Sequence, residues 1–497
     1  MGNKKSGAVF QLSGMMIITL ITQFLSIYKS SIIAANFGVC VEMDAYHFAN
    51  NLSTFFLTFI GTGVTTVIIP SYVKKLDKKA TDTFISVIFT VVICLLVGLY
   101  IGRETVVHLL TAREEAFNNY VISLMSLTMI IQLLPAMLSV TTAFYQCSNH
   151  YVIPKAILLC SNIGMLIVLV CWDSFSIYEY LYVLLGGAVF QTIVDIAVAL
   201  KLGFRFRISF DIRNPEFLSL VHVFVPTLFS TGVYKINTMV DSLLSSNLGT
   251  GQITILSYAH TIVGMVNTLV IGNLTVYVYP KIVKSITKGK EIGQKCLWSY
   301  AAVFHCLLCL LIAGFFAVGR EFIGLLYERG QFDSNAANSV YFCMCIYIFG
   351  QQNNIVRDLV YRYFYSHKNT KSTFKNGLMT SVINISLSFL MVRFWGVYGI
   401  AIATVIAGVC SLCVITLRLK KQYGIVIEWK PIAREFAVNE FCMILSIVAI
   451  KLLKTILVID NYILAFIVFG VISVAVFGAA LLICRSRLLQ LAKAIQE

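Results

Sequence analysis

The sequence predicts an all-α polytopic membrane protein, and three observations carry that prediction. Of the 497 residues, 58% are hydrophobic and only 12% are charged, whereas a soluble chain of this length needs far more polar residues to cover its surface. Apolar runs of about 20 residues, each long enough to cross a hydrocarbon core of about 30 Å, recur from end to end. These runs are continuous rather than alternating, so they predict helices and not the strands of a β-barrel.

About fourteen such runs follow one another along the chain, and each predicts a transmembrane helix. The expected limits are 8–35, 46–70, 83–101, 120–146, 153–172, 179–201, 217–246, 254–280, 297–318, 337–364, 373–394, 397–419, 434–456 and 462–484. The segments between them are too short for a separate soluble domain.

The distribution of lysine and arginine predicts the orientation, because cytoplasmic loops of membrane proteins carry the excess of these residues. If both termini are cytoplasmic, 27 of the 38 lysines and arginines fall in inside segments. This bias accounts for most of the net charge of +15. The basic balance therefore reflects topology and contact with the lipid bilayer, and it does not indicate a nucleic-acid partner.

Two sequence matches indicate an internal repeat. Pro70 and Lys74 pair with Pro280 and Lys284 at an offset of 210, and FYQCSNHYVIPK pairs with FYSHKNTKSTFK at an offset of 220. The matches align spans one to six with spans seven to twelve, and an even number of spans gives both halves the same orientation. We expect two parallel six-helix bundles around a central cavity, a transporter architecture. The expected divisions are 1–213, 214–430 and a pair of additional helices in 431–497.

Lys29, Lys235 and Arg357 lie inside expected spans, where an isolated charge is costly. A lysine at the centre of a membrane helix costs about 2.5–3.5 kcal/mol on insertion scales, and neither lysine has a carboxylate three or four residues away. A water-filled cavity with an anionic partner is the usual solution. Snorkelling to a membrane face remains an alternative for the lysines, as does an ion pair between Arg357 and its neighbour Asp358.

Acidic and polar residues complete the expected site. Asp44 opens the second span, where it could cap the helix or act in gating, and Asp241 lies in the seventh span. Gln23 and Asn51, polar residues of the first two spans, are expected to contact the substrate together with the cations. Polar residues in membrane helices can also simply join helices to one another.

Cofactor and catalytic motifs do not stand out. CLLC and CSLC have redox-like spacing but lie within apolar helices, where cysteine behaves as a small hydrophobe. No histidine pair has zinc spacing with a third ligand, and no phosphate-binding loop is present. We therefore expect no metal, no cofactor and no enzymatic activity, with the membrane potential or a coupling ion as the energy source.

Four stretches carry a family resemblance: residues 35–49 (ANFGVCVEMDAYHFA), 236–262, 325–337 (LLYERGQFDSNAA) and 362–374 (RYFYSHKNTKSTF). With them the sequence resembles the MurJ/MviN family of lipid II flippases. This family belongs to the MOP exporter superfamily, which includes Wzx-type polysaccharide flippases and MATE exporters.

The resemblance implies a flippase that moves an undecaprenyl-pyrophosphate-linked oligosaccharide, lipid II or a related precursor, from the inner to the outer leaflet by alternating access. It implies a bacterial cytoplasmic (inner) membrane location and a role in cell-wall biogenesis, with envelope-synthesis enzymes as partners. Lys29 matches a cavity arginine of the family's first helix, and Asp44 matches the acidic residue that starts its second helix.

At other positions where the family carries cations, this sequence has uncharged residues instead: Gln23, Leu57 and Thr58, and Thr261. A flippase for capsule, O-antigen or exopolysaccharide repeat units therefore stays open as an alternative to lipid II. A MATE-type exporter of small cations is favoured less, because it would need intramembrane carboxylates where cations prevail here.

Overall fold

The computed structural model describes residues 2–73, 77–148 and 150–486, and within these residues the regular structure is helical, with no strand. Lys74, which the repeat comparison pairs with Lys284, lies outside the described residues. The chain divides into two compact units, Met1–Thr254 and Ile255–Glu497. The all-α membrane fold expected from the sequence is confirmed.

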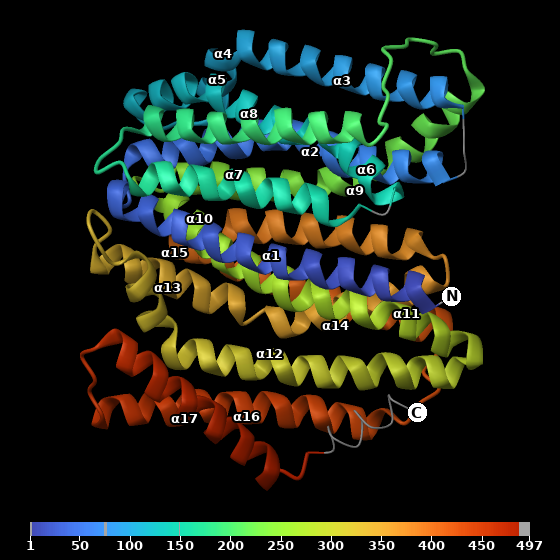
Figure 1. Ribbon diagram of the computed structural model, residues 1–497. Helices are drawn as coiled ribbons and strands as arrows, with labels where there is room; N and C mark the ends of the chain where they lie inside the picture. The colour runs from blue at the N-terminus through green and yellow to red at the C-terminus, as the bar shows by residue number, and fades with distance from the viewer. Residues whose placement is uncertain (1, 74–76, 149, 487–497) are drawn as a thin grey trace. The chain divides into compact units, whose positions relative to one another are not determined.

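The first unit is built around α2. Its helices are α1 (Gly2–Phe37), α2 (Val41–Val73), α3 (Lys78–Ile101), α4 (Arg103–Leu110), α5 (Glu115–Met137), α6 (Ser139–Cys147), α7 (Val152–Val170), α8 (Ile177–Lys201) and α9 (Pro215–Ser246), and α10 (Gln252–Val266) begins in it. α2 packs against α5, α6 and α9, while α1 packs against α7 and α7 against α8 (Figure 1).

The second unit is built around α12. After α10 it contains a π-helical segment (Asn267–Gly272), α11 (Asn273–Lys288), α12 (Lys290–Tyr327), α13 (Ser334–Ile348), α14 (Gln351–Ser366), α15 (Thr370–Tyr423), α16 (Trp429–Ile456) and α17 (Tyr462–Ile483). α12 packs against α11, α13, α14, α16 and α17, and Figure 1 shows it beside the last two helices of the chain.

Every expected span coincides with one helix or with a broken helix. Among the described residues, ten helical segments are long and apolar enough to cross a membrane, so the number fourteen stays a prediction. The span expected at 120–146 is α5 and α6, which part at Leu138, shortly after Pro135. A proline within a helix removes one hydrogen bond and crowds the turn that precedes it, so Pro135 weakens the last part of α5 just before this break.

Three further breaks separate or divide expected spans. The π-helical segment Asn267–Gly272 interrupts the span expected at 254–280, and a gap at residues 349–350 divides the span expected at 337–364 into α13 and α14. The spans expected at 373–394 and 397–419 form the single element α15, kinked at Gly396 with φ 54° and ψ −133°. Only glycine adopts this backbone conformation readily.

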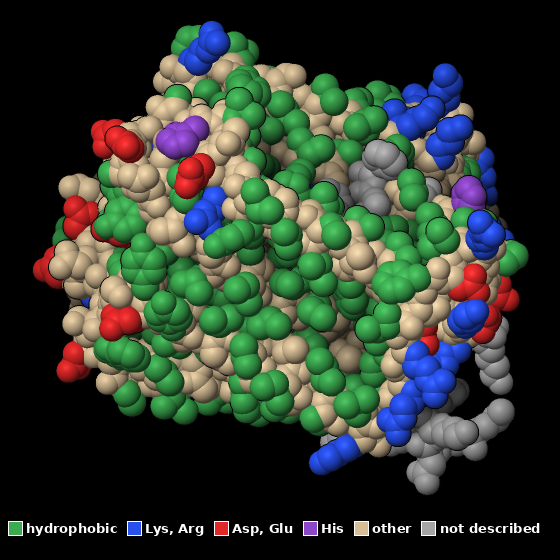
Figure 2. Space-filling view, turned by 90° about the horizontal axis from the view of Figure 1, so that it is seen from above, with side chains coloured by type: hydrophobic (Ala, Val, Ile, Leu, Met, Phe, Trp, Pro, Cys, Tyr) green, Lys and Arg blue, Asp and Glu red, His purple; other side chains and the backbone are tan. Residues whose placement is uncertain are grey.

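The surface of the helices is apolar where lipid is expected. On α3, Val91, Leu95 and Val97 each expose about half of their surface (51–52%), which in water would be a large unpartnered patch. Figure 2 shows one face of the molecule, on which hydrophobic side chains cover the middle and charged side chains gather toward opposite ends. This pattern is that of a multi-pass membrane protein.

The compact units divide the chain later than the repeat boundary expected at 213/214. α9, the first helix of the expected second bundle, packs against α2 and α3 and lies in the first unit. The expected division at 1–213, 214–430 and 431–497 is based on a repeat in the sequence. The contacts between helices do not show whether the sequence arose by duplication. The division stays a prediction.

Candidate substrate site and gate

The first helix has two opposite faces, and Lys29 lies on the polar one. Ile17, Ile21, Phe24 and Tyr28 form an exposed apolar stripe, with exposed fractions of 43–61%. The other side carries Thr19, Thr22, Gln23, Ser26, Lys29 and Ser30, because residues three, four and seven apart share a face of a helix. Lys29 therefore does not extend from the apolar stripe of α1.

The hydroxyl groups of this polar face are bound within the helix itself. Thr22 donates to the carbonyl oxygen of Ile18, Ser26 to that of Thr22, and Ser30 to that of Ser26, at 2.8–3.0 Å. Lys29 is half-buried, and no ion pair or hydrogen bond of its ammonium group is found among the side chains that the structure describes. The face thus presents a cationic group without a protein counter-ion in the described part of the chain.

On α9, Lys235 is also half-buried and lies two turns before Ser242 on the same face. Ser242 accepts a hydrogen bond of 2.8 Å from Nδ2 of Asn51, so this face of α9 is turned toward α2. Asp241 is buried at 6% exposure. Lys29 and Lys235 both lie in the first unit. Their helices have different main neighbours, because α1 packs mainly on α7 and α9 mainly on α2.

Asn51 belongs to a polar seam along α2. Its neighbour Asn50 accepts from Nε2 of Gln132 at 2.7 Å, and the hydroxyls of Ser53 and Thr128 are 3.0 Å apart. These contacts join α2 to α5, while Asn51 joins it to α9. Gln23 is half-buried on the polar face of α1. Among the side chains that the structure describes, Asn51 has a hydrogen-bond partner, Ser242, and none is found for Gln23.

Asp44 forms a buried cluster that we name the latch: Asp44, Arg113, Thr250, Gly251 and Thr254. Its carboxylate accepts from the amides of Gly251 and Thr254 at 2.6 and 2.9 Å and from the Thr254 hydroxyl at 2.7 Å. Nη1 of Arg113 lies 3.0 Å from Asp44 Oδ2, and its Nη2 donates to Thr250.

The carboxylate of the latch is completely buried, and its guanidinium group is nearly so. The Asp44 side chain is 0% exposed and that of Arg113 is 9% exposed. The amides bound by Asp44 are those at the start of α10, where a helix leaves its first N–H groups unpaired. Asp44 therefore caps α10 rather than its own helix, and it fastens α2 to the turn between α9 and α10.

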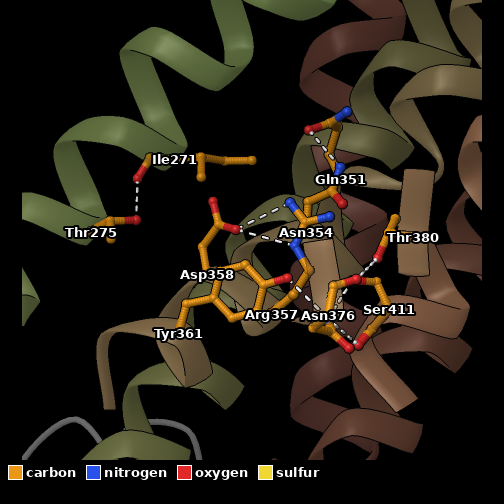
Figure 3. Close-up of polar contacts among 10 residues, drawn as sticks. All are labelled: Ile271, Thr275, Gln351, Asn354, Arg357, Asp358, Tyr361, Asn376, Thr380 and Ser411. Atoms are coloured by element: carbon orange, nitrogen blue, oxygen red, sulfur yellow. Dashed lines mark hydrogen bonds and ion pairs between the residues drawn. The ribbon is translucent and has the colours of Figure 1, made fainter. Parts of the chain in front are cut away.

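Arg357, in the second unit, has a carboxylate partner. Its Nε and Nη2 donate to Asp358 Oδ1 at 3.2 and 3.1 Å (Figure 3), and the two side chains are 22% and 34% exposed. The ion pair weighed from the sequence is therefore present. One oxygen accepts both bonds, so the pair is not the two-oxygen fork that neutralises a guanidinium most fully.

The helix beneath Arg357 is held by a polar network between α14 and α15. The Tyr361 hydroxyl accepts from Nδ2 of Asn376 at 2.9 Å, and the same amide donates to the Ser411 hydroxyl at 2.7 Å (Figure 3). The guanidinium carbon lies 5.8 Å from the centre of the Tyr361 ring. These contacts fix the position of Arg357 on α14.

Sequence reasoning missed several members of these clusters. Arg113, a member of the latch, and Gln132, a partner of Asn50, were given no expected role, although Gln132 is a polar residue within an apolar run. Such an interruption is the one signal in the sequence that could have drawn attention to Gln132.

Comparison with known proteins places this geometry in a family. A sequence model described as Lipid II flippase MurJ matches residues 33–473. The probable lipid II flippase MurJ of Synechocystis sp. is 23% identical over 443 residues, covering 84% of this chain and 83% of the relative. That of Thermotoga maritima is 22% identical over 419 residues, covering 82% and 84%.

Solved structures show the same fold. Lipid II flippase MurJ in an inward closed conformation matches with a TM-score of 0.78 at 20% identity, covering 94% of this chain and 98% of that one. An inward-facing MATE family transporter of the MOP superfamily matches with a TM-score of 0.67 at 14% identity, covering 84% and 98%. Because the sequence model spans most of the chain, the protein belongs to the lipid II flippase MurJ family.

Proposed function

We propose that this protein is a flippase that moves lipid II, or a closely related undecaprenyl-pyrophosphate-linked precursor, from the inner to the outer leaflet of the bacterial cytoplasmic membrane. Family membership supports the proposal. The observation that carries it is Lys29, a half-buried ammonium group on the polar face of a spanning helix. Both termini are cytoplasmic in this proposal.

A pyrophosphate is the ligand that suits such a group. Lysine at bilayer depth carries a cost of about 2.5–3.5 kcal/mol on insertion scales, which a hydrated cavity and an anionic ligand offset. An ammonium group binds phosphate as a compact point charge with three donors. Lys235 and Arg357 add positive charge, and Gln23 and Asn51 offer amide groups to the sugars.

The latch supplies a gate at the outer ends of α2 and α9. A buried carboxylate that holds both Arg113 and the start of α10 favours one arrangement of these helices. Alternating access needs such an arrangement to open and close. Asp44 acts as the gating residue, and Asp241 on α9 couples the movement of that helix to the gate.

The direction of transport follows from charge. A membrane potential that is negative inside favours outward movement of an anion by about 2.3 kcal/mol per charge per 100 mV. The pyrophosphate headgroup is anionic, so the potential can drive its delivery to the outer leaflet. The enzymes that make and consume the lipid-linked precursor are the expected partners in the membrane.

A second candidate substrate is a capsule, O-antigen or exopolysaccharide repeat unit on the same lipid carrier. One observation favours it: Leu57, where the family resemblance expects a cation, is a core residue at 3% exposure. Fewer cations mean weaker attraction for a densely anionic headgroup.

Complementation separates the two substrates. The full chain is expressed in cells depleted of their own lipid II flippase, with membrane insertion checked by immunoblot. Restored growth is the expected result for a lipid II flippase. Lysis of cells that contain well-inserted protein, combined with rescue of a strain lacking its polysaccharide flippase, would assign the second substrate instead.

A further inference from the structure

We propose that His305, Cys309 and Glu440 form a binding site for a borderline-soft divalent metal ion such as Zn²⁺ inside the second unit. This inference goes beyond the proposed function, because none of the three residues belongs to the proposed substrate site or to the latch. It rests on the placement of three different ligand types on two packed helices.

The three donor groups converge in the structure. His305 and Cys309 lie one turn apart on α12, and Glu440 faces them from α16. Cys309 Sγ is 3.6 Å from His305 Nδ1, and His305 Nε2 is 3.2 Å from Glu440 Oε1. With one donor atom from each residue, all three lie within 4.8 Å of one another.

These separations are close to those of a metal centre. Zinc bonds of about 2.0–2.3 Å place the donors of a tetrahedral site roughly 3.3–3.6 Å apart. The ring of His305 now faces Cys309 with one nitrogen and Glu440 with the other. For metal binding, the ring of His305 must rotate so that one of its nitrogens faces the ion together with Cys309 and Glu440. The three donor atoms must also move about 1 Å closer together.

The charges of the donors favour a divalent ion in this place. A thiolate and a carboxylate together neutralise two positive charges, so the complete centre is neutral, which matters within a spanning helix pair. The thiol loses its proton on binding. Sulfur and imidazole select Zn²⁺ over Mg²⁺ and Ca²⁺, which prefer oxygen ligands.

The surroundings resemble the outer shell of a metal site. Nδ2 of Asn439 donates to the Ala302 carbonyl at 3.1 Å and lies 3.4 Å from His305 Nδ1. Nε2 of Gln352 lies 3.5 Å from Glu440 Oε1. Groups of this kind orient metal-binding histidines and carboxylates.

The site is closed on one side and open on the other. His305 is 3% exposed and Cys309 is 0% exposed, whereas the Glu440 side chain is 35% exposed. Glu440 is thus the most exposed of the three ligands, and in this proposal the ion enters from its side. Once bound, it fastens α16 to α12 and stabilises the packing of the last two helices against the second unit.

Cobalt(II) spectroscopy on the purified full-length protein tests this site without any transport assay. After treatment with a chelator, Co²⁺ is titrated into the protein in detergent. We expect the charge-transfer absorption of a cobalt–thiolate bond, saturating at one equivalent and displaced by Zn²⁺. Cys309→Ser should abolish the band, and His305→Ala and Glu440→Gln should weaken Co²⁺ binding at least tenfold.

Two neighbouring cysteines provide matched controls. Cys306→Ser, one turn before Cys309 on α12, and Cys442→Ser, buried on α16, should keep the band. Absence of the band in the wild-type protein, or its persistence in Cys309→Ser, would overturn the proposal. Cys309→Ser is nearly isosteric, so this variant still tests the site if His305→Ala does not fold. The cobalt–thiolate band is measured without transport, so its presence or absence does not depend on the outcome of a flippase assay.

Discussion

Asp44 and Arg113 are 69 residues apart in the chain, yet they form a buried ion pair. The sequence indicated that Asp44 opens a spanning helix and that Lys29 is a charge within an apolar run. It could not indicate which groups would meet Asp44, because the amides of Gly251 and Thr254 come to it from 207 and 210 residues away. Unusual residues can be found from the sequence, but their partners depend on helix packing.

The latch predicts a large coupling energy between its two charges. In a double-mutant cycle of Asp44→Asn and Arg113→Met, each single change leaves a buried polar group without its partner, so the losses are not additive. We expect a coupling energy of about 1–3 kcal/mol. Thermal unfolding of the detergent-purified protein measures it.

Lys79 and Asp211 supply the control for this cycle. Their ion pair, at 2.8 Å, is shorter than the 3.0 Å of the latch, but the side chains are 63% and 35% exposed. Exposed pairs contribute little because water screens them. The cycle of Lys79→Met and Asp211→Asn should show no measurable coupling energy. If the cycle of Asp44→Asn and Arg113→Met also showed none, the latch would not stabilise the packing of these helices.

At the scale of helices, the sequence predicted the spans but not their interruptions. Continuous hydropathy places the spans at 373–394 and 397–419, yet the chain passes between them with a kink at Gly396 and no loop. The π-helical segment Asn267–Gly272 likewise leaves no mark in hydropathy. Such interruptions depend on backbone geometry and packing, which apolar composition does not specify.

Gly396→Ala should destabilise the protein by about 1–3 kcal/mol, the usual cost of a strained backbone conformation at a residue with a Cβ atom. The reason is the positive φ of 54° at this kink. Gly377→Ala, in the same helix with no atom within 4 Å of the new Cβ, should instead be neutral or stabilise by up to about 1 kcal/mol. Thermal unfolding of both variants decides the point, and equal effects would argue against strain at Gly396.

The turn after α12 predicts a dependence of stability on pH. Glu328 Oε2 lies 2.7 Å from Nη1 of Arg320 and accepts from the Tyr462 hydroxyl of α17. Burial raises the pKa of Glu328, but the hydrogen bond and charge of Arg320, together with hydrogen bonds from Ser334 and Tyr462, outweigh burial and lower the net pKa. The stabilisation is therefore present above the unfolded pKa of about 4.3 and is lost as the pH falls through the lower folded pKa.

Glu328→Gln should accordingly reduce stability at pH 7 and make less difference at pH 3. Melting temperatures of wild type and variant at the two pH values measure this change. Glu291→Gln, at an exposed position at the start of α12, is the control and should make little difference at either pH. A Glu328→Gln effect that does not shrink in acid would contradict the assigned ion pair.

For the whole molecule, composition was enough to predict the class, because a chain that is 58% hydrophobic cannot cover itself with polar residues. The motifs at 325–337 and 362–374 were enough to indicate the family. The packing of α9 within the first unit and the approach of Glu440 to His305 could not be predicted, because both join segments that are far apart in the sequence.

Anion binding by Lys29 is tested most directly by transport of fluorescent lipid II in proteoliposomes that contain the purified protein. Lys29→Arg should retain most of the wild-type rate, whereas Lys29→Gln should lose about tenfold or more, equivalent to at least about 1.4 kcal/mol. Lys451→Gln, at an exposed lysine of α16, should transport like wild type. Wild-type transport by well-folded Lys29→Gln would contradict the role of this ammonium group in holding the pyrophosphate.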